Sequence, residues 1–188
     1  MIFYRLILLL VAGLIGCVYS APIPAHLHSN VDSSLELFAT RARKFSVKHA
    51  AEAVIIKNKI DKHFNPGHSK ATFWSGTLRK GGSVVSVKET AHHRAEKAGK
   101  KTIGHALHEA GIPESRIDNN PHAAHIWDHA SAVWAQKSHG HADVVLGELV
   151  RPESVYNRIE KPILMNNKEV TKVVEWNAHT NKETHIKP

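Results

Sequence analysis

A single cysteine, Cys17, constrains the fold of this chain more than any other sequence feature. It lies within an apolar N-terminal stretch that we expect to be removed. The remaining protein then has no disulfide and no thiolate metal ligand, so cysteine chemistry is excluded. The 188 residues correspond to about one domain, and 42% hydrophobic residues exclude both a disordered polar tail and a multi-span membrane protein. Such a domain must be stabilised by its hydrophobic core.

The N-terminus has the pattern of an export signal. Arg5 supplies the positive start, residues 6–15 form a short apolar run, and Val18 and Ser20 are the small residues before a cleavage site. The run is too short to span a bilayer well. We expect residues 1–20 to be a signal peptide and the protein to be secreted, with no stable membrane insertion after cleavage. An uncleaved anchor and a bacterial lipoprotein signal ending at Cys17 are the alternatives.

The order of the apolar patterns predicts an α/β fold. Helical spacing from about Ser33 to Ile60 predicts a helical N-terminal part over residues 21–70. This part packs on a C-terminal α/β part over residues 71–179 that has a small, mainly parallel sheet. The expected strands of this part are 71–76, 142–149 and 170–176, and its expected helices are 86–98, 102–110 and 122–138. We expect a proline-containing loop between the last two strands and a disordered tail over residues 180–188.

The helix that follows Pro121 carries the most informative pattern. One of its faces carries Trp127, Ala130, Ser131, Trp134, Ala135 and Ser138. Two interpretations remain open. The face is either a core face with a tolerated serine, which the periodicity alone favours, or an aromatic wall beside a hydroxyl, suited to stacking a flat ring while Ser131 binds phosphate or ribose.

Sixteen histidines make metal binding the rival hypothesis. His122, His125 and His129 form a stripe nearly opposite the tryptophan face, where we expect them to face solvent. His105 and His108 followed by Glu109 resemble a fragment of a metalloprotease helix, but the order is not His-Glu-x-x-His. We therefore expect no dedicated metal site.

The formal net charge of +8 raises the question of an anionic partner. The basic residues are scattered, with short runs at 41–44 and 97–101, and no stripe of Lys and Arg interleaved with aromatic residues is present. The sequence contains no zinc finger or other nucleic-acid signature. We expect no nucleic-acid partner.

An ordered set of short motifs resembles a known family. The set covers roughly residues 71 to 179 and consists of Phe73-Trp74-Ser75-Gly76, Thr102-Ile103, Trp127 with Ser131, Trp134-Ala135, Ala142-Asp143-Val144-Val145, Ser154 to Glu160 with Pro162 and Leu164, Val170 to Trp176, and His179. Together they resemble the ADP-ribosyl cyclase and NAD glycohydrolase family. Because cysteines are lacking after residue 17, the resemblance is to a cysteine-free member of microbial type.

The resemblance implies roles for particular residues. Trp74 and Trp127 correspond to the two tryptophans that flank the nicotinamide end of NAD, and Ser131 to a serine that holds phosphate or ribose. Glu160 corresponds to the catalytic carboxylate on a late loop, and Ser75 is a further candidate phosphate contact. The chemistry is consistent with these roles, because departure of nicotinamide leaves an oxocarbenium-like ribosyl centre that one carboxylate can stabilise.

The sequence departs from the family pattern after Thr102-Ile103. The family places an acidic residue there, whereas this chain has Gly104 and then His105, which is a candidate replacement contact to nicotinamide. The acid influences whether the intermediate is hydrolysed or cyclised, so the product ratio is left open.

These inferences combine into one functional prediction. We expect a secreted enzyme that cleaves the nicotinamide N-glycosidic bond of NAD, giving nicotinamide plus ADP-ribose, cyclic ADP-ribose or both. NAD is the substrate, and no additional cofactor is expected. The alternative is a secreted histidine-rich module that binds metal or anionic surfaces without catalysis.

Overall fold

The computed structural model describes the backbone of residues 25–188 and the side chains of 37, 39, 40, 42 and 45–188. The expected signal peptide, 1–20, lies outside the described residues. The chain divides into two compact units, residues 1–45 and 46–188. In the described part of the chain, no helix is long and apolar enough to cross a membrane.

Helix α2, Ala25–His63, continues from the first unit into the second. Within the second unit one stripe of the helix and the residue after it is fully buried, formed by Ile56, Ile60 and Phe64. Their spacing of four residues keeps them on one face of the helix. Asn65 and Pro66 then break the helical pattern, and Phe64 packs edge-on against Trp134 at a ring-centroid distance of 5.7 Å.

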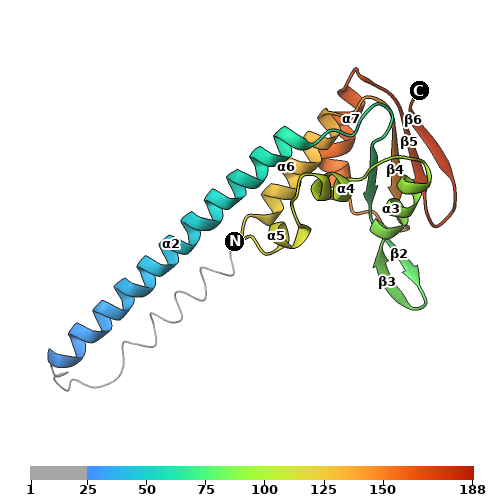
Figure 1. The fold of residues 1–188 in the computed structure, drawn as a ribbon. Coiled ribbons are helices and arrows are strands. Elements are labelled where there is room, and N and C mark those ends of the chain that lie inside the picture. Colours follow the sequence, from blue (N-terminus) through green and yellow to red (C-terminus); the bar gives the residue numbers. More distant parts are fainter. Residues whose placement is uncertain (1–24) are drawn as a thin grey trace. The chain divides into compact units, whose positions relative to one another are not determined.

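Four strands form a small sheet in the order β1-β4-β5-β6 (Figure 1). Strands β1 (Thr72–Ser75), β4 (Gly140–Leu146) and β5 (Val170–Asn177) are parallel to their neighbours, and β6 (Glu183–Lys187) is antiparallel to β5. The predicted α/β class with a small, mainly parallel sheet is therefore confirmed.

Alternation along the strands gives the sheet two apolar faces. On one face, Phe73 and Val144 belong to the main core together with residues of α2 and of α6, Ala123–Gln136. On the other face, Val145 packs with Ala91 of α3, Lys88–Lys97. Helices therefore cover both faces of the sheet, as parallel strands require.

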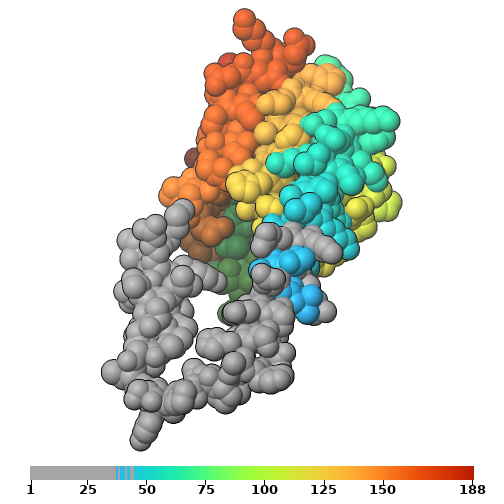
Figure 2. Space-filling model, turned by 90° about the vertical axis from the view of Figure 1, so that its left-hand side faces the viewer, coloured from blue at the N-terminus to red at the C-terminus, as the bar shows by residue number. Residues whose placement is uncertain are grey.

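Helices α2 and α6 lie side by side, as Figure 2 shows for the residues drawn in colour. His129 of α6 contacts Asp61 of α2 with Nε2 and Oδ1 2.8 Å apart, and Lys137 hydrogen-bonds the Asp61 carbonyl. Asn120 adds a hydrogen bond to the carbonyl of His49. These contacts fix α6, which carries two of the predicted site residues.

The structure adds short elements that the sequence analysis does not predict. A hairpin joins β2 (Thr77–Lys80) to β3 (Ser83–Ser86) through Gly81 and Gly82, both with positive φ, which the tight turn of a hairpin favours. Helix α4 (Ile103–Glu109) is predicted, whereas α5 (Glu114–Asp118) is new.

Two expectations for the C-terminal part are wrong. The segment expected to be a loop contains the π-helical turn η1 (Tyr156–Glu160) and helix α7 (Lys161–Asn166). Pro162 is the second residue of α7, directly after the π-helical turn. The expected disordered tail contains β6, whose backbone groups pair with those of β5.

Candidate functional site

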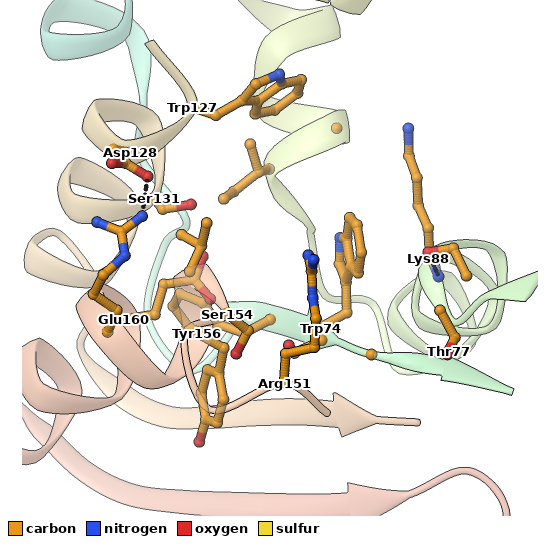
Figure 3. A pocket seen from close by; sticks show the side chains of 18 of the residues that line it. Trp74, Thr77, Lys88, Trp127, Asp128, Ser131, Arg151, Ser154, Tyr156 and Glu160 are labelled. Atoms are coloured by element: carbon orange, nitrogen blue, oxygen red, sulfur yellow. Dashed lines mark hydrogen bonds and ion pairs between the residues drawn. The ribbon is translucent and has the colours of Figure 1, made fainter. Parts of the chain in front are cut away.

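A pocket of about 960 Å³ lies where the carboxyl end of β1 meets α6 and η1. Because β1 and β4 are parallel, the segments that follow them begin at the same edge of the sheet, and residues from both segments line the pocket. Of the six residues predicted for the site, five line this pocket: Trp74, Ser75, Trp127, Ser131 and Glu160. Figure 3 shows Ser131 and Glu160 at one side of it and Lys88 at the other.

Two glycines bring the segment after β4 against the segment after β1. A Cβ on Gly147 would lie 2.5 Å from the Thr77 carbonyl oxygen, and one on Gly76 would lie 2.5 Å from the Leu149 carbonyl oxygen. The Thr77 and Leu149 backbones exchange hydrogen bonds of 3.0 and 3.2 Å, which only this close approach allows. The chain is thereby directed across the pocket, where Arg151 and the residues that follow contribute to its lining.

Glu160 is the buried acid of the pocket. The residue is only 4% exposed although it lines the pocket, and Ser131 lines the same pocket. Burial raises the pKa of Glu160 to about 8, and the Ser131 hydroxyl opposes part of this rise. A carboxyl group with this pKa is ready to ionise when a cation binds next to it.

Three of the four tryptophans divide between the pocket and the core. Trp74 and Trp127 are partly exposed and line the pocket, whereas Trp134 is fully buried in the main core. The Trp127 indole N–H donates to Oδ1 of Asp118 at 2.9 Å, which fixes the plane of the ring. The α6 face is therefore divided, because Trp127 and Ser131 reach the pocket while Trp134 and Ala135 fill the core.

A row of polar groups follows the pocket beside Glu160. Arg158 Nη2 donates to Oδ1 of Asp128 at 2.7 Å, and both residues line the pocket. Ser154 and the exposed Arg151 extend the row on the segment after β4 (Figure 3). The sequence analysis assigns no role to Asp128, Arg151 or Arg158, because the apolar periodicity does not mark charged residues.

The opposite end of the pocket holds an ion pair. Lys88, the first residue of α3, pairs through Nζ with Oε2 of Glu114 in α5. A Cβ on Gly104 would stand 2.7 Å from Cε1 of His92 and 3.2 Å from Oε1 of Glu114. The glycine therefore leaves room for the His92 ring and, beside it, for the Glu114 carboxylate.

His105 lies outside the lining of this pocket. Its Nδ1 contacts the Thr102 backbone N–H at 3.1 Å and the Thr102 hydroxyl at 2.9 Å, forming the capping box of α4. The centroid of the His105 ring lies 4.7 Å from the centroid of the His92 ring. The structure therefore gives His105 a helix-capping role, and it does not bring this residue to Trp74, Trp127 and Glu160.

The histidines whose side chains the structure describes do not gather around a common point. Among residues whose side chains the structure describes, no group of three or more His, Cys, Asp and Glu is arranged to hold a metal ion. In the predicted stripe on α6, His125 is exposed and His129 contacts Asp61.

Comparison with known proteins yields partial structural similarity. Neither a protein-family model nor a curated protein matches this chain. A crystal structure of Aplysia cyclase complexed with substrate NGD and product cGDPR is similar at a TM-score of 0.39 and 19% identity over 58% of this chain and 49% of that chain. A crystal structure of ADP ribosyl cyclase complexed with N1-cIDPR has a TM-score of 0.41 and 20% identity over 64% and 54% of the two chains. This chain spans about half the length of these solved chains.

Proposed function

We propose that the protein cleaves the bond between nicotinamide and ribose in NAD, giving nicotinamide with ADP-ribose, cyclic ADP-ribose or both. One observation carries the proposal: a single buried carboxyl group, that of Glu160, lies at the side of a pocket that two tryptophans also line. The proposal includes export, which rests on residues 1–20 of the sequence.

The chemistry requires one carboxylate. When the glycosidic bond breaks, the pyridinium takes both bonding electrons and leaves as neutral nicotinamide, so no acid has to protonate the leaving group. The positive charge passes to the ribosyl carbon and ring oxygen, where an ionised Glu160 stabilises it. Attack of water on that carbon and loss of a proton give ADP-ribose, and attack of an adenine nitrogen gives the cyclic product.

The raised pKa of Glu160 fits a cationic substrate. The pyridinium is positively charged before the reaction, and a nearby opposite charge favours the ionised carboxyl. Binding therefore displaces the proton that burial holds on Glu160. The Ser131 hydroxyl then donates a hydrogen bond to the carboxylate that forms.

The rest of the pocket provides contacts for the other parts of the substrate. Trp74 and Trp127 offer aromatic faces to the cationic ring. The Lys88 and Glu114 pair offers a donor and an acceptor, which are the two groups that a carboxamide complements. Arg151, with Ser75 at the end of β1, is positioned for the diphosphate.

The test is to incubate the purified protein with NAD in the presence of a chelator and to resolve the products by chromatography. The proposal predicts nicotinamide release that the chelator does not affect. A folded protein that releases no nicotinamide would contradict it and return attention to the histidine-rich binding module. The ratio of ADP-ribose to cyclic ADP-ribose measures how far water competes with adenine.

A further inference from the structure

Glu160 ends a turn of unusual geometry. Residues 156–160 form the single π-helical turn η1, and the backbone N–H of Lys161 donates to the carbonyl of Tyr156, five residues earlier. Ordinary helices close four residues apart, and π-turns of this kind occur frequently at functional sites. The turn therefore needs contacts that favour it over a regular helix.

One carboxylate holds both ends of this turn from outside. The Tyr156 hydroxyl donates to Oε1 of Glu175 at 2.7 Å, and Lys161 Nζ donates to the same oxygen at 2.8 Å. Glu175 lies on β5, between β4 and β6, and its side chain is 14% exposed. The two residues that the backbone hydrogen bond joins are thus also joined through the side chain of Glu175.

This double contact depends on the π-turn. In a regular α-helix, residues five apart point in directions that differ by about 140°, so one side chain cannot hold both. The π-turn brings Tyr156 and Lys161 to the same side, toward β5. The contacts of Glu175 therefore favour the π form of the segment over the α form.

We propose that Glu175 is a positioning residue that directs the Glu160 carboxyl group into the pocket by holding Tyr156 and Lys161 at the two ends of the π-turn. This inference rests on the proposed function of Glu160. Glu175 is not among the residues that line the pocket, so it acts on Glu160 only through Tyr156 and Lys161.

We call Glu175, Tyr156 and Lys161 the clamp, and the charges of these three residues suit a positioning role. Lys161 compensates the charge of Glu175, and the Lys161 ammonium also lies 5.8 Å from the Tyr156 ring centroid. Burial, together with the hydrogen bond to Glu175, raises the pKa of Tyr156 far above its ordinary value. The phenol therefore remains a donor throughout the pH range in which Glu160 titrates.

Two variants each remove one of the two contacts with Glu175 and change little else. Tyr156→Phe removes only the hydroxyl group, and Lys161→Met removes the ammonium group from a side chain that is 39% exposed. The matched control is Lys187→Met, because Lys187 Nζ donates to the carbonyls of Leu164 and Asn167 at the other end of α7. All three proteins are compared with the wild type as full chains.

We expect Tyr156→Phe and Lys161→Met each to lower kcat for NAD cleavage by about tenfold and to change KM by less than about twofold, because they displace the carboxyl group and leave the ring site intact. Glu175→Gln, which keeps an acceptor oxygen, should retain more activity than Glu175→Ala. Lys187→Met should leave kcat unchanged.

The second readout does not need activity. Titration of ¹³C-labelled glutamate carboxyl groups should show a wild-type signal with a midpoint near pH 8, which moves toward the ordinary range in Tyr156→Phe and Lys161→Met as Glu160 loses its buried position. The other charged groups that line the pocket are unchanged in these variants: Lys88, Glu114, Asp118, Asp128, Arg151, Glu153 and Arg158.

Unchanged kcat and an unchanged glutamate midpoint in both variants would overturn the role of Glu175. An equal shift in Lys187→Met would also overturn it, because the effect would then come from α7 in general. A wild-type protein that releases no nicotinamide but shows the midpoint shifts would instead contradict the proposed function and leave the clamp established.

Discussion

Ser131 on α6 and Glu160 on η1 line the same pocket, and each residue is no more than 5% exposed. Burial raises the pKa of Glu160, and the Ser131 hydroxyl opposes part of this rise, because a donor beside a carboxyl group favours its ionised form. The balance between the two effects sets the pH at which Glu160 ionises.

Glu160→Gln should stabilise the fold at alkaline pH. Because the pKa of Glu160 is about 8 in the native state, against 4.5 as the ordinary value, the native protein retains a proton that the unfolded chain loses. The stability that this group contributes is full below pH 4.5 and is lost as the pH rises through 8. Urea unfolding at pH 9 should show the Gln variant about 2–5 kcal/mol more stable than the wild type, and at pH 4 about equal. A wild-type advantage at pH 9 would contradict the buried state of the carboxyl group.

Ser131→Ala should move the pH dependence of catalysis. The wild-type kcat/KM should rise with pH through a group of pKa near 8, since the free enzyme must ionise Glu160. Removing the Ser131 donor should raise that midpoint by about one pH unit, as expected for a hydrogen bond to a charged group. The measurement is kcat/KM from pH 5 to pH 10. A lower midpoint in the variant would show that Ser131 does not favour the carboxylate.

Trp127→Ala should weaken substrate binding by about 10- to 100-fold, corresponding to the loss of one stacking contact of about 1–3 kcal/mol. Isothermal titration with NAD on a Glu160→Gln background measures binding without turnover. Asp118→Asn, which weakens only the partner of the indole N–H, should have a smaller effect in the same direction. The matched control is Trp134→Phe in the core, which should lower thermal stability and leave NAD binding unchanged. Equal losses of binding in Trp127→Ala and Trp134→Phe would contradict the division of the tryptophans.

Lys88→Met should change which pyridine substituent the pocket accepts. Lys88 neutralises Glu114 at the end of the pocket, so its removal leaves a carboxylate that repels another carboxylate. We expect the variant to lose about tenfold more kcat/KM for the nicotinic acid dinucleotide than for NAD. Steady-state rates with the two substrates test this, with Lys97→Met on the outer part of α3 as the control. Equal losses for both substrates would place the substituent elsewhere.

The sequence indicates the regular elements well and the irregular ones poorly. Strands β1, β4 and β5 and the helix after Pro121 follow from apolar periodicity, because burial on one or both faces imposes that periodicity. The sequence does not indicate the π-turn and α7, because Pro162 favours a loop interpretation although proline also occurs near the start of helices. The two glycines of the β2–β3 turn were a usable hairpin signal between two short strand-like runs.

The residues of the site also fall into those that the sequence predicts and those that it does not. Trp74, Trp127 and Glu160 could be proposed from the sequence, because they carry motifs. Glu114 and Lys88 could not, since their pairing depends on how α3 and α5 meet over Gly104. His105 differs from its predicted role for a related reason. Its neighbour Gly104 lines the pocket, but the capping hydrogen bonds turn the His105 side chain toward Thr102.

The most direct test of the central claim compares nicotinamide release from NAD by the wild type, Glu160→Gln and Glu153→Gln at pH 8.5. Glu153 also lines the pocket but is exposed, so its variant controls for the loss of one negative charge. We predict that Glu160→Gln lowers kcat by about 10³-fold or more while NAD still binds, and that Glu153→Gln stays within about threefold of the wild type. Nicotinamide release by folded Glu160→Gln at the wild-type rate would contradict the assignment of Glu160 as the catalytic carboxylate.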